Sequence, residues 1–489
     1  MANLTVHELS VDLGFEAPNH RDLVHEEIAQ RLGGAGFHSP PPPLGSGSDD
    51  RARLLDWFAS PSLPANATIG LQPGYLVSAP IPFPDGHRYI GRGVAELGSP
   101  AHIKLMNGAN PSDVTTAVVV SKAWNDNNTF GGVPTIFENL TIDGNAANNT
   151  GTYGCLLPFN YWSRVRWCRF DSPRLHHVLL TKIMKNGSAS SIDNADNRLY
   201  GNRFRNGLTG TAGAGIRHLS TGGNNNMDVR VFDNHFESAQ HGIWSDDAAG
   251  WTIFDNHIWA RRNGINIDSG FLATKVIANY IDGFGNENTA ATTYYGIRVR
   301  GFDGHGCIVA LNNVDITEDI FAGIFNCYSL EAQNAGSHIA GGMNLAFGHA
   351  TPNAAHHGFL YGANAGLVIN GQIGNLAHGF VTGQDFEQVL SGGGTMTLLY
   401  PRPIQATATV DWASIAAGGT VTNTFTLTGA AVGDPCVASL STLTTAGSIS
   451  ISARVTAANT VSVTIRNDTG SAVDPASGTM RIILWKTVA

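Results

Sequence analysis

An internal repeat fills the middle of the chain and limits the folds that are open to it. In each copy an aliphatic residue is followed three positions later by Asn, and two positions further by another aliphatic residue or Phe. Successive repeat Asn residues are 32, 22, 23 and 33 positions apart. A period of about 20 to 35 residues with short strand-like segments is typical of a solenoid, in which every coil needs stacked neighbours. The five full copies are residues 199–204, 231–236, 253–258, 276–281 and 309–314.

A second repeated element, Gly followed by Ile, comes after these Asn positions. It occurs at residues 215–216, 242–243, 264–265, 296–297 and 323–324, with Gly-Phe at 358–359 and 379–380. The chain contains 58 Gly among 489 residues and only 14% charged residues. Gly and Asn tolerate positive φ, which indicates many tight turns between short strands. We therefore predict an all-β chain built as a right-handed parallel β-helix, with the repeated Asn stacked in a hydrogen-bonded ladder.

Changes in composition divide the chain into three segments. Residues 1–45 are expected to form a small N-terminal head that ends in a Pro-rich linker. Residues 46–405 contain the repeat and are assigned to the β-helix. Residues 406–489 are rich in Thr, Ala and Val that alternate between turns, which predicts an antiparallel β-sandwich.

Several classes of partner are disfavoured by the sequence. The net charge of −9 offers no general attraction for nucleic acid. No signal peptide and no apolar run of 18 residues is found, so we expect a protein that is made in the cytoplasm and does not span a membrane. The five Cys are scattered without a CxxC motif, so neither a zinc site nor a disulfide framework is expected, and no cofactor is predicted.

Two stretches of the chain resemble known protein families. Asp49-Asp50, residues 71–76, 89–93 and 137–145 look like the first coils of the pectate-lyase-like β-helix superfamily. Residues 429–435 and 473–482 are similar to a small end domain of phage tail fibres and spikes. The whole arrangement thus resembles a bacteriophage tailspike. This resemblance implies a homotrimer in the virion tail, with its head docked on a tail or baseplate protein and its β-helix bound to a host surface polysaccharide.

Strand alternation predicts which side chains leave the core of the β-helix. If Ile of each Gly-Ile pair points inward, the second and fourth residues after Gly point outward. Asp246 and Asp268 would then be neighbours on adjacent coils, and a carboxylate pair can act as acid and as base or nucleophile in glycoside hydrolysis. We expect these two residues to be catalytic, with substrate bound by Trp244, Asn266, Arg298 and Arg300. The two predicted columns are Arg217, Trp244, Asn266, Arg298 and Phe325, and Leu219, Asp246, Asp268, Arg300 and Cys327.

Other interpretations of these residues remain open. Asp246 and Asp268 could be a solvated column that Arg300 partly neutralises. Asp233, His235, Asp255 and His257 could hold a metal or transfer protons, but polar residues are expected around such a turn, and no metal site is predicted.

The function has alternatives as well. A glycoside hydrolase is favoured over a lyase, because no acidic calcium loop appears. A lyase base could still come from Arg298, Arg300, Lys275, Arg261 or Arg262. A non-enzymatic receptor-binding fibre or adhesin, and a bacterial β-helix lyase or epimerase, are the remaining candidates.

Overall fold

The structure of the chain is a computed structural model. It describes residues 37–45, 47–93, 100–128, 134–159, 161–190, 195–207, 213–220, 227–271, 274–284, 293–301, 306–316, 324–332, 338–347, 357–363, 368–369, 376–378, 386–390, 404–442 and 449–485. The predicted N-terminal head, up to residue 36, lies outside these described residues.

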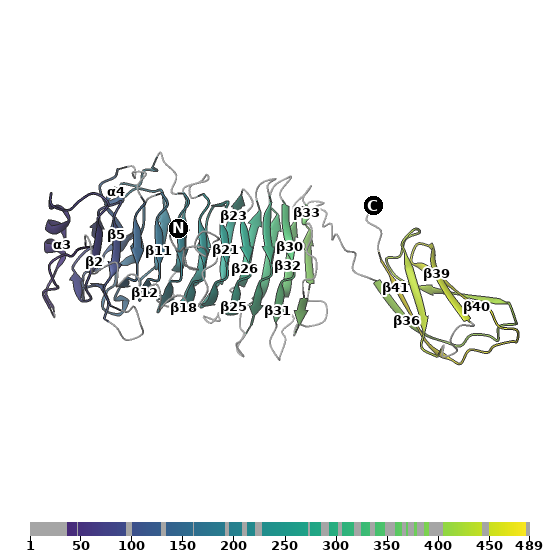
Figure 1. The fold of residues 1–489 in the computed structure, drawn as a ribbon. Helices are drawn as coiled ribbons and strands as arrows, with labels where there is room; N and C mark the ends of the chain where they lie inside the picture. Colours follow the sequence, from purple (N-terminus) through teal and green to yellow (C-terminus); the bar gives the residue numbers. More distant parts are fainter. Residues whose placement is uncertain are drawn as a thin grey trace, which may run out of the picture. The chain divides into compact units, whose positions relative to one another are not determined.

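Three parallel sheets wind along the chain, and each coil contributes one strand to each sheet (Figure 1). Sheet A consists of β1 (Phe37–His38), β2 (Thr68–Leu71), β5 (Arg88–Gly91), β8 (Ile136–Glu138), β11 (Arg164–Arg166), β14 (Arg198–Tyr200), β17 (Arg230–Phe232), β21 (Thr252–Phe254), β24 (Lys275–Ile277), β27 (Cys307–Ala310), β30 (His338–Gly342) and β33 (Val368–Ile369). Sheet B consists of β3 (Tyr75–Val77), β6 (Ile103–Leu105), β9 (Thr141–Asp143), β12 (Arg169–Asp171), β15 (Arg203–Arg205), β18 (His235–Ala239), β22 (His257–Ala260), β25 (Tyr280–Gly283), β28 (Asn313–Asp315), β31 (Leu345–Phe347) and β34 (Leu376–His378).

The third sheet carries the predicted site. Sheet C consists of β4 (Ile81–Phe83), β7 (Ser112–Ser121), β10 (Thr152–Leu157), β13 (Val178–Thr181), β16 (Ala214–Leu219), β19 (His241–Ser245), β23 (Ile265–Phe271), β26 (Thr293–Gly301), β29 (Ile324–Ala332), β32 (His357–Ala363) and β35 (Phe386–Leu390), and β20 (Ala248–Ala249) pairs with β23. The predicted right-handed parallel β-helix is confirmed.

The predicted Asn ladder is present and is buried. Each ladder Asn lies in the turn that leads from a strand of sheet A to the next strand of sheet B. The Nδ2 of each ladder Asn donates to Oδ1 of the Asn on the next coil, at 2.9–3.0 Å, and also to a backbone carbonyl. These bonds satisfy polar groups at a turn that has no strand pairing of its own. The ladder extends one coil beyond the predicted copies and comprises Asn202, Asn234, Asn256, Asn279, Asn312 and Asn344.

Aliphatic side chains fill the interior beneath sheet C, as the Gly-Ile pattern predicted. Ile216, Ile243, Ile265 and Ile297 lie opposite one another on successive strands and are fully buried. Close packing of neighbouring coils explains why Gly precedes each Ile. A Cβ on Gly264 would approach the carbonyl oxygen of Gly296 to 2.5 Å, which real structures do not allow.

The N-terminal end of the β-helix is closed by local structure. Helix α3 (Arg51–Phe58) buries Leu54 and Phe58, and the Phe58 ring packs 5.0 Å from that of Phe83 in the first coil. Within the described residues, the other short helices are α4 (Lys122–Asn125) and η2 (Ala146–Asn148). Terminal coils of a solenoid need such a cover because they have no neighbour on one side.

The proline run belongs structurally to this end of the β-helix. Strand β1 pairs with β2, so the first coil includes residues before the expected boundary at residue 46. The hydroxyl of Tyr75 donates to the carbonyl of Pro41 at 2.9 Å, and Arg53 donates to that of Pro42 at 3.2 Å. The segment expected to be a linker therefore packs on the first coil in its described part.

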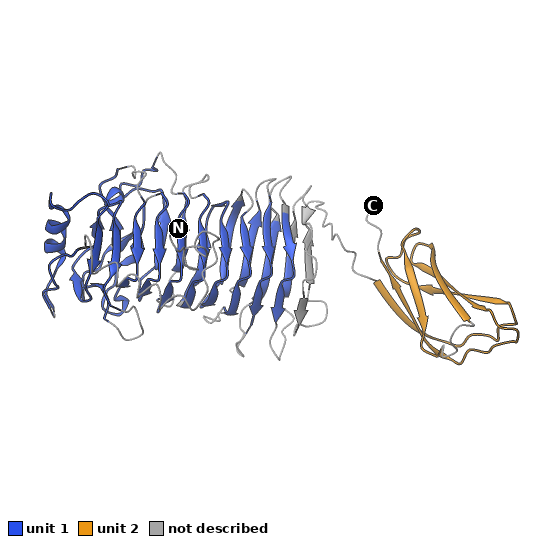
Figure 2. Ribbon diagram, viewed as in Figure 1, with its two compact units in different colours: residues 1–368, 374–395 blue, residues 369–373, 396–489 orange. Residues whose placement is uncertain are grey.

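The C-terminal residues form the predicted antiparallel β-sandwich. The chain divides into two compact units, residues 1–368 with 374–395 and residues 369–373 with 396–489 (Figure 2). The second unit has its own core around Trp412, Val461, Val463 and Ile482. Its two sheets are β36 (Ile404–Val410), β41 (Gly478–Leu484) and β38 (Cys436–Leu440), and β37 (Thr420–Thr426), β40 (Thr460–Asn467) and β39 (Ile449–Ala457). Among the described residues, no helix has the length and apolarity needed to span a membrane.

Candidate functional site

Most of the first predicted column is a straight row on the outer face of sheet C. Arg217, Trp244, Asn266 and Arg298 lie directly opposite one another on β16, β19, β23 and β26. The Gly-Ile register predicted from the sequence is therefore correct over these four coils. Asp246 and Asp268 follow the paired residues Ser245 and Ile267, which places them on neighbouring coils, as expected.

The prediction was wrong for the fifth member of each column. Phe325 and Cys327 are fully buried in the core rather than exposed on sheet C. In β29 the residue opposite Ile297 is Tyr328, so Ser329 continues the row of Arg298, and Glu331 lies opposite Arg300. Ile324 is out of register with the Ile residues of the earlier pairs, because it lies opposite Thr293, four residues before Ile297. The later Gly-Phe pair is in register, since Phe359 lies opposite Tyr328.

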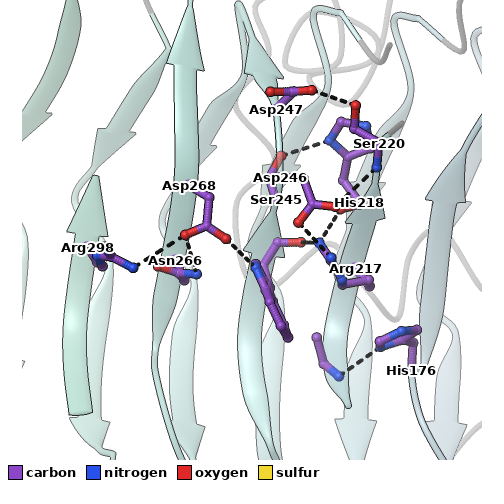
Figure 3. Close-up of polar contacts among 12 residues, drawn as sticks. His176, Arg217, His218, Ser220, Ser245, Asp246, Asp247, Asn266, Asp268 and Arg298 are labelled. Carbon is purple, nitrogen blue, oxygen red and sulfur yellow. Dashed lines mark hydrogen bonds and ion pairs between the residues drawn. The ribbon is translucent and has the colours of Figure 1, made fainter. Parts of the chain in front are cut away.

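Asp246 is held by a buried arginine of the preceding coil. The Nη2 of Arg217 donates to Asp246 Oδ1 at 2.6 Å, and the backbone N–H of Ser220 donates to Oδ2 at 3.2 Å (Figure 3). Burial lowers the pKa of Arg217, and the neighbouring Asp246 opposes that effect. The guanidinium of Arg217 also lies 4.1 Å from the centre of the Trp244 ring, in a cation–π contact. One face of the indole expected to stack on sugar is therefore covered by arginine.

Asp268 accepts hydrogen bonds from three side chains. Its Oδ2 accepts from Trp244 Nε1 at 2.8 Å, and its Oδ1 accepts from Asn266 Nδ2 at 3.2 Å and from Arg298 at 3.4 Å. The pairing between β23 and β26 shifts by one residue between Ile267 and Gly270, so Asp268 lies in an irregular or bulged part of β23. A bulge turns a side chain away from the regular strand direction. Trp244, Asn266 and Arg298, three of the four predicted substrate-binding residues, thus orient this carboxylate.

Arg300, the fourth predicted substrate-binding residue, pairs with a different acid. Its Nε lies 3.3 Å from Glu331 Oε2. Glu331 also accepts from Arg298 Nε at 2.9 Å and from the Ser329 hydroxyl at 3.1 Å. Arg298 therefore bridges Asp268 and Glu331, and the neutralising role expected of Arg300 beside Asp268 belongs to Arg298.

Four further polar residues at this site, Asp247, Ser220, His218 and Ser245, were missed from the sequence. Asp247 accepts a hydrogen bond from the Ser220 hydroxyl at 2.5 Å. Beneath them, the fully buried His218 bonds to the Ser245 hydroxyl at 2.8 Å, and burial lowers the pKa of His218 to about 3. His218 is therefore a neutral ring at physiological pH. The two adjacent acids at 246–247 can be seen in the sequence and could have indicated Asp247, but strand alternation selects only Asp246.

The rival group of Asp and His residues lies at the start of strands in sheet B. Asp233, His235, Asp255 and His257 line a hollow of about 320 Å³ together with Tyr280. The His235 and His257 rings stack at 4.6 Å, and the His257 and Tyr280 rings stack at 5.1 Å. His257 bonds to Asp282 at 2.8 Å, which raises the pKa of His257. Across the described part of the chain, no three His, Cys, Asp or Glu side chains are placed to hold a metal ion.

Comparison with known proteins finds similarity to solved tailspike structures. No family model and no curated protein matches the sequence. The tailspike protein of Escherichia coli bacteriophage HK620, solved in complex with a pentasaccharide, is similar with a TM-score of 0.46 and 12% sequence identity over 94% of this chain and 95% of that chain. A mutant of the same tailspike with a hexasaccharide gives a TM-score of 0.47 at the same identity and coverage. An identity of 12% is too low to assign a role to any residue of this chain.

Proposed function

We propose that the outer face of sheet C binds a polysaccharide and cleaves its glycosidic bonds. The observation that carries this proposal is the pair of Asp246 and Asp268 on neighbouring coils, with their side chains 28% and 29% exposed. Asp246 directly follows β19 and Asp268 lies in β23, so a sugar chain lying along the β-helix would meet them in sequence. Glycoside hydrolysis requires two carboxyl groups on opposite sides of the scissile bond.

The hydrogen bonds favour different roles for the acids. Asp268 accepts hydrogen bonds from three donors, one of them Arg298, and these bonds hold its carboxylate in one orientation. It is the candidate nucleophile or base. Asp246 is likewise bound by Arg217 and is the candidate second carboxylate. The hydroxyl bond of Asp247 involves no cation, which makes Asp247 the best-suited alternative for the proton donor.

At the level of the whole chain, we propose a phage tailspike. In this proposal the β-helix binds a host surface polysaccharide, three copies associate, and the N-terminal head attaches to a phage tail or baseplate protein. A β-helix followed by a separate β-sandwich supports this assignment.

One observation favours the alternative of a fibre that binds without cleaving. Asp246, Asp268 and Glu331 are each tied to an arginine, so their carboxylate oxygens already have partners within the fold. A row of neutralised acids beside an indole can recognise sugar hydroxyls without chemistry.

An assay of bond cleavage separates the two functions. Purified protein is incubated with a panel of bacterial surface polysaccharides, and both reducing ends and ultraviolet-absorbing unsaturated ends are followed. We expect reducing ends to increase with at least one polysaccharide, while Asp268→Asn and Asp246→Asn lose activity and Asp282→Asn on sheet B keeps it. Binding without new ends would overturn the enzymatic proposal, and unsaturated ends would identify a lyase.

A further inference from the structure

A row of three arginines runs along the outer face of sheet A. Arg164, Arg198 and Arg230 lie directly opposite one another on β11, β14 and β17, and all three are exposed. Neighbouring strands lie about 4.8 Å apart. Like charges placed directly opposite one another destabilise a sheet. The arginine row therefore destabilises the fold of the free protein.

These arginines have no acidic partner in the part of the chain that the structure describes. None of the three side chains forms an ion pair or hydrogen bond there. Asp196 is the acid nearest to Arg198 in sequence, but its carboxylate accepts from the indole of Trp162 at 3.1 Å. Burial lowers the pKa of Arg198, the neighbouring Arg230 and Arg164 lower it further, and the nearby Tyr200 and Asp196 oppose this shift without forming an ion pair with Arg198.

Other arginines of the same sheet are paired, so the lack of a partner is particular to this row. Arg88 and Arg166 both bind the fully buried carboxylate of Glu138, at 2.8 and 2.9 Å. In sheet A, Glu138 thus neutralises the two arginines that are paired within the fold. The three exposed positions instead leave their guanidinium groups available to an anion from outside.

An apolar row lies beside the arginines on the same strands. The rings of Tyr200, Phe232 and Phe254 stack at 4.8 Å, with their planes 5° and 9° from parallel. At one end of the arginine row, Trp162 is 52% exposed. A rigid apolar strip beside a cationic row suits a ligand that has both sugar rings and negative charges.

We propose that the arginine row, defined as Arg164, Arg198 and Arg230, binds an acidic polysaccharide. Carboxylate, phosphate or sulfate groups spaced along the glycan would each meet a guanidinium, which binds such groups through paired N–H donors. The inference deepens the proposed function, since it takes the ligand of this chain to be a polysaccharide and assigns it negative charge. It places a second contact surface on a sheet other than the one that carries Asp246 and Asp268.

The described surface argues against two other anionic occupants. A second copy of the chain would have to offer a row of acids, but Asp143, Glu237 and Asp282 on sheet B are already paired with Lys104, Arg205 and His257. A nucleic acid would be expected to stack bases on aromatic faces. The faces of Tyr200, Phe232 and Phe254 are covered by one another, so these rings offer a glycan or any other ligand only their edges, and the net charge of −9 gives no general attraction for nucleic acid.

Binding measurements with defined polymers test the row. The probes are polygalacturonate, dextran sulfate, neutral dextran and an oligothymidylate, with affinity measured by calorimetry at low and high salt. We expect polygalacturonate or dextran sulfate to bind, neutral dextran not to bind, and affinity to fall as salt screens exposed charges. The combined variant Arg164→Gln, Arg198→Gln and Arg230→Gln should weaken binding by about tenfold, because exposed charge pairs contribute modestly.

A matched variant controls for the change in net charge. Arg53→Gln, Arg203→Gln and Arg466→Gln together remove the same charge from other surfaces and should leave affinity within about twofold. Equal loss in both variants, no binding of either acidic glycan, or tighter binding of the oligothymidylate would overturn the proposal. A row variant that loses mass in light scattering would show that a second copy occupies the row, which also overturns it.

The test does not depend on the cleavage site. Asp268→Asn should bind the acidic polymers as the unsubstituted protein does. If the protein binds acidic polymers at the arginine row but cleaves no polysaccharide, only the proposed enzymatic function fails. If it cleaves a polysaccharide but the row does not bind acidic polymers, only the present proposal fails.

Discussion

Removal of one ladder side chain should strongly destabilise the β-helix. In Asn256→Ala, three bonds donated by Asn256 Nδ2 are lost, to Val231 O at 3.0 Å, Phe254 O at 3.0 Å and Asn279 Oδ1 at 2.9 Å. Its Oδ1 also accepts from the backbone N–H and the Nδ2 of Asn234, at 3.2 and 2.9 Å. An alanine side chain cannot form any of these hydrogen bonds. Because Asn256 is only 2% exposed, water cannot easily reach the groups that lose their partner.

The magnitude follows from the groups that are left without partners. A buried donor or acceptor without a partner costs about 1–3 kcal/mol. The N–H of Asn234 and the carbonyl of Val231 are the two most affected, so we expect a loss of about 4 kcal/mol in the free energy of unfolding. Urea unfolding followed by circular dichroism measures this loss as a lower midpoint at an unchanged slope.

A control on another coil makes the result interpretable. Asn313 follows a ladder residue but sits at a partly exposed position of sheet B. Asn313→Ala should cost about 0.5 kcal/mol or less. Equal losses from the two substitutions, or a loss below about 1 kcal/mol for Asn256→Ala, would refute the ladder as a source of stability.

Three further predictions concern separate parts of the molecule. His218 is neutral when folded and its pKa is lowered to about 3, so the unfolded chain binds more protons below pH 6.5 and the stability that this residue supports is lost as the pH falls; its share of the loss should reach about 2 kcal/mol between pH 7 and pH 5, and His218→Gln should reduce the total loss by about that amount while buried His102 and His241, whose pKa values are also lowered, still contribute, as urea unfolding at both pH values would show. Gly264→Ala should cost about 1–3 kcal/mol in the same assay because its Cβ would press on Gly296 O, whereas Gly470→Ala, which meets no atom within 4 Å, should be neutral. Trp244→Phe should lower the cleavage rate more than substrate affinity, since it removes the indole bond to Asp268 but keeps a ring; equal loss of both would contradict a positioning role.

Much of the fold is readable from the sequence because each coil repeats the same physical requirements. Asn256 and its equivalents satisfy turn backbone groups, and Gly264 and its equivalents allow neighbouring coils to approach. Register is harder to read where the strands change length. At β29 the Gly-Ile pair at 323–324 lies outside the repeat register, so Phe325 and Cys327 were assigned to the surface although they fill the core.

The site was predictable only as far as strand alternation holds. Alternation correctly paired Asp246 with Asp268, but it could not show which cation holds each acid. The register of β23 with β26 shifts between Ile267 and Gly270, and Arg298 forms an ion pair with Asp268, which simple alternation does not predict. Asp247 was missed for a similar reason, since it follows the end of β19 and belongs to no column.

The central claim is that the sheet C carboxylates hydrolyse a polysaccharide. The most direct measurement is digestion of a bound surface polysaccharide in water enriched in heavy oxygen, with mass spectrometry of the products. Hydrolysis predicts one heavy oxygen atom at each new reducing end, and Asp268→Asn should abolish its appearance while binding persists. Products without heavy oxygen, or no products from any polysaccharide that the protein binds, would contradict the claim.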